Sequence, residues 1–200
     1  MTKTIDYFFG IGSPWAFIGL EPFTALAARF DADIRPYIIP LVEENGAIFS
    51  RNRPEPRRAY WFKDLKRWAV LRGKSLDLDN RASLSDPTPA GLTVIAAQLD
   101  GKDWIGLTKA LQEAFWSRAE DIGNAEVRRT IADAAGFDGA ALEARAQQSD
   151  VQELWRSNYD VAKAAGVFGF PTFRYDGELY WGQDSLPFLE RHLNGEKLIA

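Results

Sequence analysis

Cysteine is absent from this chain of 200 residues. Its absence excludes a disulfide framework, a zinc site built on thiolates and any redox cycle carried by the protein's own side chains. Histidine occurs only once, at His192, so a metal site built on a cluster of histidines is excluded as well, and we expect no metal. Any sulfur chemistry would have to use a bound molecule.

Long apolar runs are absent too. No apolar stretch approaches the roughly 20 residues that span a bilayer. Lys3 and Asp6 lie within the first six residues, before any apolar run can form, so we expect neither a signal peptide nor a membrane partner, and a cytoplasmic location. The 24 basic and 28 acidic residues give a net charge of −4 and are distributed along the whole chain, so we expect no nucleic-acid partner.

Aromatic side chains, by contrast, are abundant. The chain carries 13 phenylalanines and 7 tryptophans among 46% hydrophobic residues. A chain of this length and composition can build a sizeable core, and we expect most of the aromatic rings to lie in it. The remainder are available to line a pocket for a flat apolar ligand.

The first 40 residues contain a strand, a helix and a second strand. Residues 5–9 form a short apolar run that is typical of a buried strand. Ser13 and Pro14 provide an N-cap and a first-turn proline for a helix that we expect to reach about Phe30. Residues 34–39 predict the second strand. Two strands joined through a helix in this way are parallel.

The middle of the chain, residues 41–165, predicts helices throughout. It is rich in Ala, Arg, Glu and Leu and has few strand-like runs. Thr88 is expected to cap one helix, with a proline directly after it. Ser149 and Gln152 form a capping-box pattern that begins another.

After Gly166 the strand pattern returns. Residues 172–175 and 178–181 flank an Asp-Gly pair, which predicts a β-hairpin. A last helix is expected over residues 184–193.

This order of elements predicts an α/β protein with a thioredoxin-like fold. The strand-helix-strand half and the hairpin-helix half are separated by a long all-helical insertion. We assign residues 1–40 and 166–200 to the thioredoxin-like domain and residues 41–165 to the helical insertion domain.

Ser13-Pro14-Trp15-Ala16 follows the first predicted strand directly. It resembles a Cys-Pro-Trp-Cys redox motif from which both sulfurs have been removed. A thioredoxin-like fold places the first residue of that motif at a helix N-terminus, beside unpaired backbone N–H groups and the positive end of the helix dipole. Ser13 occupies this position, and glutathione is the obvious source of a borrowed sulfur.

Four short pieces, in order along nearly the whole chain, carry a resemblance to one enzyme family. They are Ser13-Pro14-Trp15-Ala16, Asn52-Arg53-Pro54 with Tyr60 and Asp64-Leu65, Gly166-Val167-Phe168-Gly169-Phe170-Pro171-Thr172-Phe173, and Trp181-Gly182-Gln183-Asp184. With these pieces the chain resembles the 2-hydroxychromene-2-carboxylate isomerases, which are akin to the kappa-class glutathione transferases.

The resemblance implies an activity, a cofactor and a set of site residues. The activity is the interconversion of 2-hydroxychromene-2-carboxylate and trans-o-hydroxybenzylidenepyruvate, or a close analogue, in aromatic-compound degradation, with glutathione as a cofactor that is not consumed. Ser13 would be the catalytic residue and would donate a hydrogen bond to the sulfur. The implied partners are a small aromatic substrate and a second copy of the chain in a homodimer. The implied glutathione-binding residues are Ser13, Asn52, Arg57, Phe170, Pro171, Gln183 and Asp184, and those of the substrate pocket are Trp15, Tyr60 and Trp61.

Other interpretations stay open. A kappa-type glutathione transferase or peroxidase would consume glutathione. A non-catalytic thioredoxin-fold protein would hold peptides in the groove beside Pro171, and Ser13 would then only cap a helix. Ala16 and Ser185 stand where relatives often have tyrosine and arginine, which leaves the identity of the second substrate open.

Overall fold

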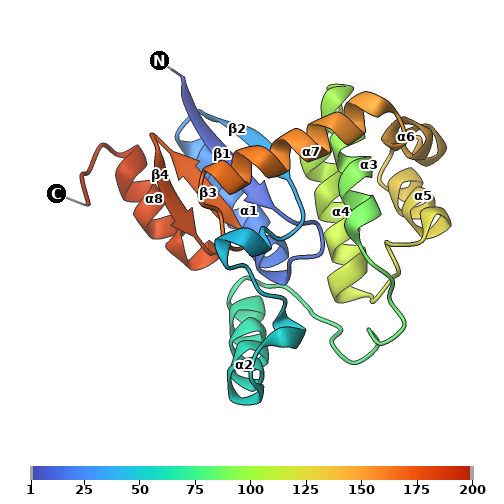
Figure 1. Cartoon of the computed structure of the whole chain (residues 1–200), viewed down its shortest axis with the longest axis horizontal. Helices are drawn as coiled ribbons and strands as arrows, with labels where there is room; N and C mark the ends of the chain where they lie inside the picture. The colour runs from blue at the N-terminus through green and yellow to red at the C-terminus, as the bar shows by residue number, and fades with distance from the viewer. Residues whose placement is uncertain (1, 199–200) are drawn as a thin grey trace.

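A four-stranded mixed sheet lies at the centre of the fold (Figure 1). The computed structural model describes residues 2–198. The strand order is β2-β1-β3-β4, in which β1 is parallel to β2 and antiparallel to β3, and β3 and β4 form a hairpin. The predicted thioredoxin-like α/β fold is confirmed. The strands are β1 (Lys3–Phe9), β2 (Ala32–Ile38), β3 (Thr172–Tyr175) and β4 (Glu178–Trp181).

Helices surround the sheet, and all of the regular structure between β2 and β3 is helical in the part of the chain described (Figure 1). Among residues 2–198, no helix has both the length and the apolar character needed to cross a bilayer. Short 3₁₀ turns are η1 (Glu43–Asn45), η2 (Ser50–Asn52) and η3 (Gln183–Ser185). The α-helices are α1 (Pro14–Arg29), α2 (Glu55–Leu71), α3 (Thr88–Leu99), α4 (Trp104–Ser117), α5 (Ala125–Ala134), α6 (Gly139–Ala146), α7 (Ser149–Ala164) and α8 (Leu186–Leu193).

Aromatic packing holds α1 on one face of the sheet. Tyr7 stacks on Phe9 with 4.4 Å between ring centroids and on Phe173 of β3 with 5.5 Å. Phe23 of α1 lies 4.7 Å from the Tyr7 ring. Burial of each such ring contributes roughly 1.5–3 kcal/mol. Because side chains alternate along a strand, Phe8 lies on the other face, in a smaller buried cluster with residues of α7.

One cluster of buried side chains joins the insertion to the sheet. It contains Phe9 of β1 together with Ile95 of α3 and Leu107 of α4. Helices of the insertion therefore share a core with the strands. The division of the chain into two domains at residues 40 and 166 stays a prediction.

Two helix starts differ from the prediction. Thr88 is the first residue of α3 rather than its cap, and its N–H and hydroxyl donate to Asp86 Oδ1 at 3.0 and 2.8 Å. Ser149 is the first residue of α7, whose start has no side-chain cap. Gln152 Nε2 donates instead to the carbonyl oxygen of Ala146 at 3.0 Å. In both places a side chain of the capping pattern donates to an acceptor that lies outside the pattern.

Candidate functional site

Ser13 lies where the loop after β1 becomes α1. Its backbone is extended, with φ −78° and ψ 120°, and Pro14 occupies the first turn, so the predicted N-cap is confirmed. Ser13 Oγ accepts a hydrogen bond from the backbone N–H of Ala16 at 3.2 Å. Among residues 2–198, no acceptor takes the hydroxyl hydrogen of Ser13. This donor is therefore available to a bound group, at a helix end that favours negative charge.

Phe170 and Pro171 lie beside this turn and are joined by a cis peptide bond. The Phe170 ring packs so closely on the turn that a Cβ atom at Gly10 would lie 3.0 Å from Phe170 Cε2. The N–H of Ser13 in turn donates to the carbonyl oxygen of Gly10 at 3.0 Å. Within the described residues, neither the N–H nor the C=O of Phe170 has a hydrogen-bond partner. Both groups can pair with the backbone of an extended peptide.

The segment after β4 is tied to the same proline. The N–H of Gly182 donates to the carbonyl oxygen of Pro171 at 2.8 Å. Gly182 adopts φ +89°, and a Cβ atom there would collide with Asp184 Oδ1, so only glycine fits without strain. The Asp184 side chain is exposed, and across residues 2–198 its carboxylate accepts no hydrogen bond and forms no ion pair. It can accept a ligand ammonium group.

Gln183 has a different setting from its neighbour Asp184. Its side chain is fully buried at 0% exposure, and a Cβ atom at Gly19 of α1 would lie 2.6 Å from Gln183 Cβ. Gln183 Oε1 accepts hydrogen bonds from Arg72 Nε at 3.1 Å and Arg72 Nη2 at 3.0 Å. This side chain ties the end of α2 to α1 and η3. Its role in holding glutathione stays a prediction, and the structure favours a positioning role.

Two of the three predicted pocket aromatics lie together. The rings of Trp15 in α1 and Trp61 in α2 meet edge to face, 6.2 Å apart. Tyr60 is turned toward solvent at 60% exposure, with the Arg67 guanidinium 5.9 Å from its ring centroid. Trp15 and Trp61 therefore form one aromatic surface near Ser13, and Tyr60 lies outside it.

Positive charge is concentrated in α2 and its flanks. Residues 50–74 contain 9 of the 24 Lys and Arg residues, whereas their only acids are Glu55 and Asp64. The expectation of evenly distributed charge is therefore wrong for this segment. Trp61 of this segment contacts Trp15 in the first turn of α1. The positive field of α2 consequently favours anions near the Ser13 site.

The predicted ligands Asn52 and Arg57 both lie exposed in this basic segment. Within the described part of the chain, no hydrogen bond joins either residue to Ser13. Arg53 belongs to the Asn52-Arg53-Pro54 piece but was not among the predicted ligands, and its Nε is buried without a hydrogen-bond partner in residues 2–198. Burial and the charge of Arg57 lower the pKa of Arg53. Arg53 and Arg57 together offer charge to a carboxylate.

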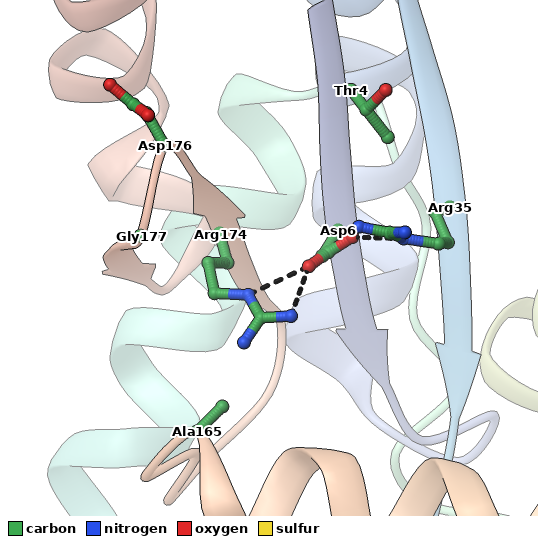
Figure 2. Close-up of a pocket in the computed structure, with 7 residues that line it drawn as sticks. All are labelled: Thr4, Asp6, Arg35, Ala165, Arg174, Asp176 and Gly177. Atoms are coloured by element: carbon green, nitrogen blue, oxygen red, sulfur yellow. Dashed lines mark hydrogen bonds and ion pairs between the residues drawn. The ribbon is translucent and has the colours of Figure 1, made fainter.

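A cavity of about 330 Å³ lies on the sheet face away from α1 (Figure 2). In it the Asp6 carboxylate accepts hydrogen bonds from Arg35 Nε at 2.6 Å and Arg174 Nε at 2.8 Å. Both arginines are register partners of Asp6, on β2 and β3. Asp6 is only 3% exposed, so its buried charge needs this compensation. The cluster stabilises the pairing of three strands and does not contact Ser13.

The chemistry open to Ser13 is hydrogen-bond donation rather than nucleophilic attack. A serine nucleophile needs an adjacent base. The one histidine, His192, lies in α8 with its Nδ1 bonded to the Tyr180 hydroxyl at 2.7 Å. Within residues 2–198, no group of three or more His, Asp and Glu side chains is arranged to hold a metal ion. The site therefore suits a bound anion held by Ser13 and the N-terminus of α1.

The chain is similar over nearly its whole length to known proteins of the thioredoxin-like fold. A family model described as a DSBA-like thioredoxin domain matches residues 4–194. The 2-hydroxychromene-2-carboxylate isomerase of Sphingobium xenophagum is 29% identical over 198 residues, covering 96% of this chain and 99% of the relative. A solved structure of 2-hydroxychromene-2-carboxylate isomerase matches with a TM-score of 0.77 and 21% identity, over 96% of this chain and 95% of its own. The cytosolic disulfide reductase DsbM of Pseudomonas aeruginosa, solved with GSH, has a TM-score of 0.69 and 20% identity, over 96% of this chain and 99% of its own.

These likenesses confirm the family resemblance predicted from the four motifs. The solved structures show that the thioredoxin-like fold is shared. The curated relatives carry the name of an isomerase, which indicates an enzyme. Since the family model spans nearly the whole chain, the protein belongs to the DSBA-like thioredoxin domain family.

Proposed function

We propose that this protein is a glutathione-dependent isomerase that interconverts 2-hydroxychromene-2-carboxylate and trans-o-hydroxybenzylidenepyruvate, or a close analogue of that pair. The observation that carries the proposal is the free hydroxyl of Ser13 at the start of α1, in a chain without cysteine. The curated relatives named as this isomerase support the reaction. The similar fold of a protein solved with GSH supports the cofactor.

The free polar groups around Ser13 match the parts of glutathione in turn. The Ser13 hydroxyl and the helix end suit a thiolate. The N–H and C=O of Phe170 suit the backbone of the cysteinyl residue, which would add to the protein as a short strand. The Asp184 carboxylate suits the γ-glutamyl ammonium group. The hydrogen bond from Gly182 to Pro171 holds these segments in one relative position.

The carboxylates of glutathione require cations on the same side of the molecule. The basic segment 50–74 provides them, with Arg57 exposed and Arg53 partly buried. Asn52, in the turn before α2, has an amide that can donate to the tripeptide. We assign Asn52, Arg53 and Arg57 to the glutathione side of the site.

When bound, glutathione would supply a thiolate that adds reversibly to an unsaturated ring carbon, which allows ring opening and bond rotation before the thiol leaves unchanged. Ser13 would keep that sulfur charged by donating a hydrogen bond to it, and it would retain its own proton because no base lies beside it within residues 2–198. Trp15 and Trp61 would provide an apolar surface for the substrate ring and exclude water from it.

The other interpretations remain candidates of lower support. A kappa-type transferase or peroxidase would use the same glutathione contacts but consume the thiol. A peptide-binding protein would use Phe170 and Pro171 without needing the Ser13 hydroxyl. The homodimer, the place in aromatic-compound degradation and the cytoplasmic location stay predictions that accompany this proposal.

The proposal is tested by following the absorbance change of the purified protein with either compound as the starting material. We expect interconversion only with glutathione, toward the same equilibrium from both sides, and no activity with S-methylglutathione, which cannot form a thiolate. Ser13→Ala should lower the rate by roughly 10–100-fold, because a hydrogen bond to a charged group is lost. Equal rates with glutathione and S-methylglutathione would refute the proposal.

A further inference from the structure

A half-buried arginine without a carboxylate partner lies close to the Ser13 turn. Arg81 is in the segment between α2 and α3, and its Cζ is 3.8 Å from the centroid of the Trp116 ring and 4.1 Å from that of Phe115. Its Nη1 donates a hydrogen bond to the carbonyl oxygen of Phe115. In the described part of the chain, no carboxylate oxygen lies within 4.0 Å of its guanidinium nitrogens.

The aromatic platform under Arg81 reaches the loop that leads into Ser13. A Cβ atom at Gly12 would lie 3.8 Å from Phe115 Cε1. Gln112, in the same helix as Phe115, donates from Nε2 to the carbonyl oxygen of Ile11 at 3.2 Å. One ring therefore separates the Arg81 guanidinium from the residue that precedes Ser13.

Arg81 has unused donors in this setting. Its Nε and Nη2 make no hydrogen bond within residues 2–198. The indole Nε1 of Trp116, in a side chain only 7% exposed, also lacks a partner there. Burial lowers the pKa of Arg81 to about 10, with only the charge of Asp77 opposing it, so the group still carries its charge at neutral pH. A partly desolvated cation with free donors is stabilised by an anion that enters the site.

The geometry of the guanidinium indicates which anion fits. It is a planar fork that pairs with a carboxylate through two parallel hydrogen bonds, and its contacts with the Phe115 and Trp116 rings and its hydrogen bond to the Phe115 carbonyl oxygen hold it in place. A planar aromatic acid can present its carboxylate to Arg81 and its ring to the neighbouring aromatic side chains. We propose that Arg81 binds the carboxylate of the aromatic substrate.

This assignment rests on the proposed function and places the substrate opposite the glutathione contacts. In Figure 1 the segment that joins α2 to α3 passes on the α4 side of the molecule, whereas β3, β4 and α8 lie on the other side. Phe170 and Asp184 belong to that second side. The loop that leads into Ser13 packs on Phe170 at Gly10 and on the Phe115 ring at Gly12, so it lies between the proposed tripeptide contacts and the ring that Arg81 contacts.

The test compares a planar acid with its neutral isostere. Chromone-2-carboxylate and chromone-2-carboxamide have the same ring and differ at the charged group, and calorimetry gives the Kd of each for the glutathione-saturated protein. We expect the wild type to bind the acid roughly 10–100-fold more tightly than the amide. Arg81→Met should abolish this preference, and Arg81→Lys, the control that keeps the charge but loses the planar fork, should retain part of it. The Kd for glutathione should stay within about twofold in both variants.

Each outcome decides the assignment. Equal affinity of the wild type for acid and amide, no detectable binding of the acid, or an unchanged preference in Arg81→Met would overturn it. Loss of glutathione affinity in Arg81→Met with the acid preference intact would assign Arg81 to the tripeptide instead. If Arg81→Met does not fold, the comparison of the two ligands on the wild type and on Arg81→Lys still decides. Failure of glutathione itself to bind the wild type would count against the proposed function. The preference for the acid over the amide can then be measured on the protein without glutathione.

Discussion

Replacing Ser13 by alanine should raise the pKa of the bound glutathione thiol by about 1–2 units. A cysteine thiol has a pKa near 8.5, and lowering it by about two units requires roughly 2.7 kcal/mol of differential stabilisation. The Ser13 site offers two sources, because its free hydroxyl can donate to the sulfur at the N-terminus of α1. A hydrogen bond to a charged group contributes roughly 1.5–3 kcal/mol and a helix end up to about 2 kcal/mol. The alanine variant keeps only the helix end.

The assay is a pH titration of the ultraviolet absorbance of the thiolate, with each variant saturated with glutathione. Ser13→Thr is the matched control, since it keeps both the hydroxyl and the capping group and should leave the thiol pKa close to that of the wild type. The alanine variant also loses the cap that accepts from the Ala16 N–H, which costs about 1 kcal/mol of the free energy of unfolding. Denaturant unfolding measured in parallel separates this loss from the change in thiol pKa. Equal thiol pKa values in the wild type and Ser13→Ala would refute the role given to Ser13.

Three further predictions concern the surroundings of Ser13 and the stability of the fold. Asp184→Asn should raise the Kd for glutathione roughly 10–100-fold in calorimetry, because a charge-assisted hydrogen bond to the ligand ammonium group is lost. Cysteinylglycine lacks the γ-glutamyl group and should bind the wild type and Asp184→Asn equally. An unchanged Kd for glutathione would contradict the role assigned to Asp184. Arg72→Met should lower the free energy of unfolding by roughly 1–3 kcal/mol, since it leaves Gln183 Oε1 buried without a donor; a loss below about 0.5 kcal/mol would show that this hydrogen bond is not needed. The hydrogen bond from Tyr159, followed by a backbone hydrogen bond and the bond from Lys163, lowers the pKa of Glu44 from its ordinary 4.5 to about 2. Glu44 therefore stabilises the folded state fully above about pH 5 and loses this effect as the pH falls toward 2. Glu44→Gln should have a lower free energy of unfolding than the wild type at neutral pH, and this difference should vanish in acid. A difference in the free energy of unfolding that does not depend on pH would contradict the prediction.

Local patterns in the sequence were sufficient to predict the elements that surround Ser13. Residues 5–9, the Ser13-Pro14 pair and the Asp-Gly turn near the end each carry a strong local signal, and the structure has a strand, a helix start and a hairpin there. The capping patterns at Thr88 and Ser149 failed because the competing acceptors come from outside the pattern.

The features that depend on packing between distant segments were not predictable. The family resemblance makes Gln183 a predicted ligand residue, and only the structure shows that its side-chain amide oxygen accepts a hydrogen bond from Arg72, 111 positions away. Arg81 is an ordinary loop arginine in the sequence. It becomes a candidate binding residue only because the fold places its guanidinium against the rings of Phe115 and Trp116. Phe115 is 34 residues away in the sequence. A single sequence contains no local signal for such encounters.

The proposed mechanism requires that glutathione supplies the reactive sulfur and is released unchanged after each turnover. Counting glutathione thiols while 2-hydroxychromene-2-carboxylate turns over, with glutathione present far below the substrate concentration, tests it most directly. We expect the reaction to reach equilibrium with many product molecules formed per glutathione and with the thiol content unchanged. A reaction that stops at one product per glutathione with a matching loss of thiol, or one that proceeds equally without glutathione, would contradict it.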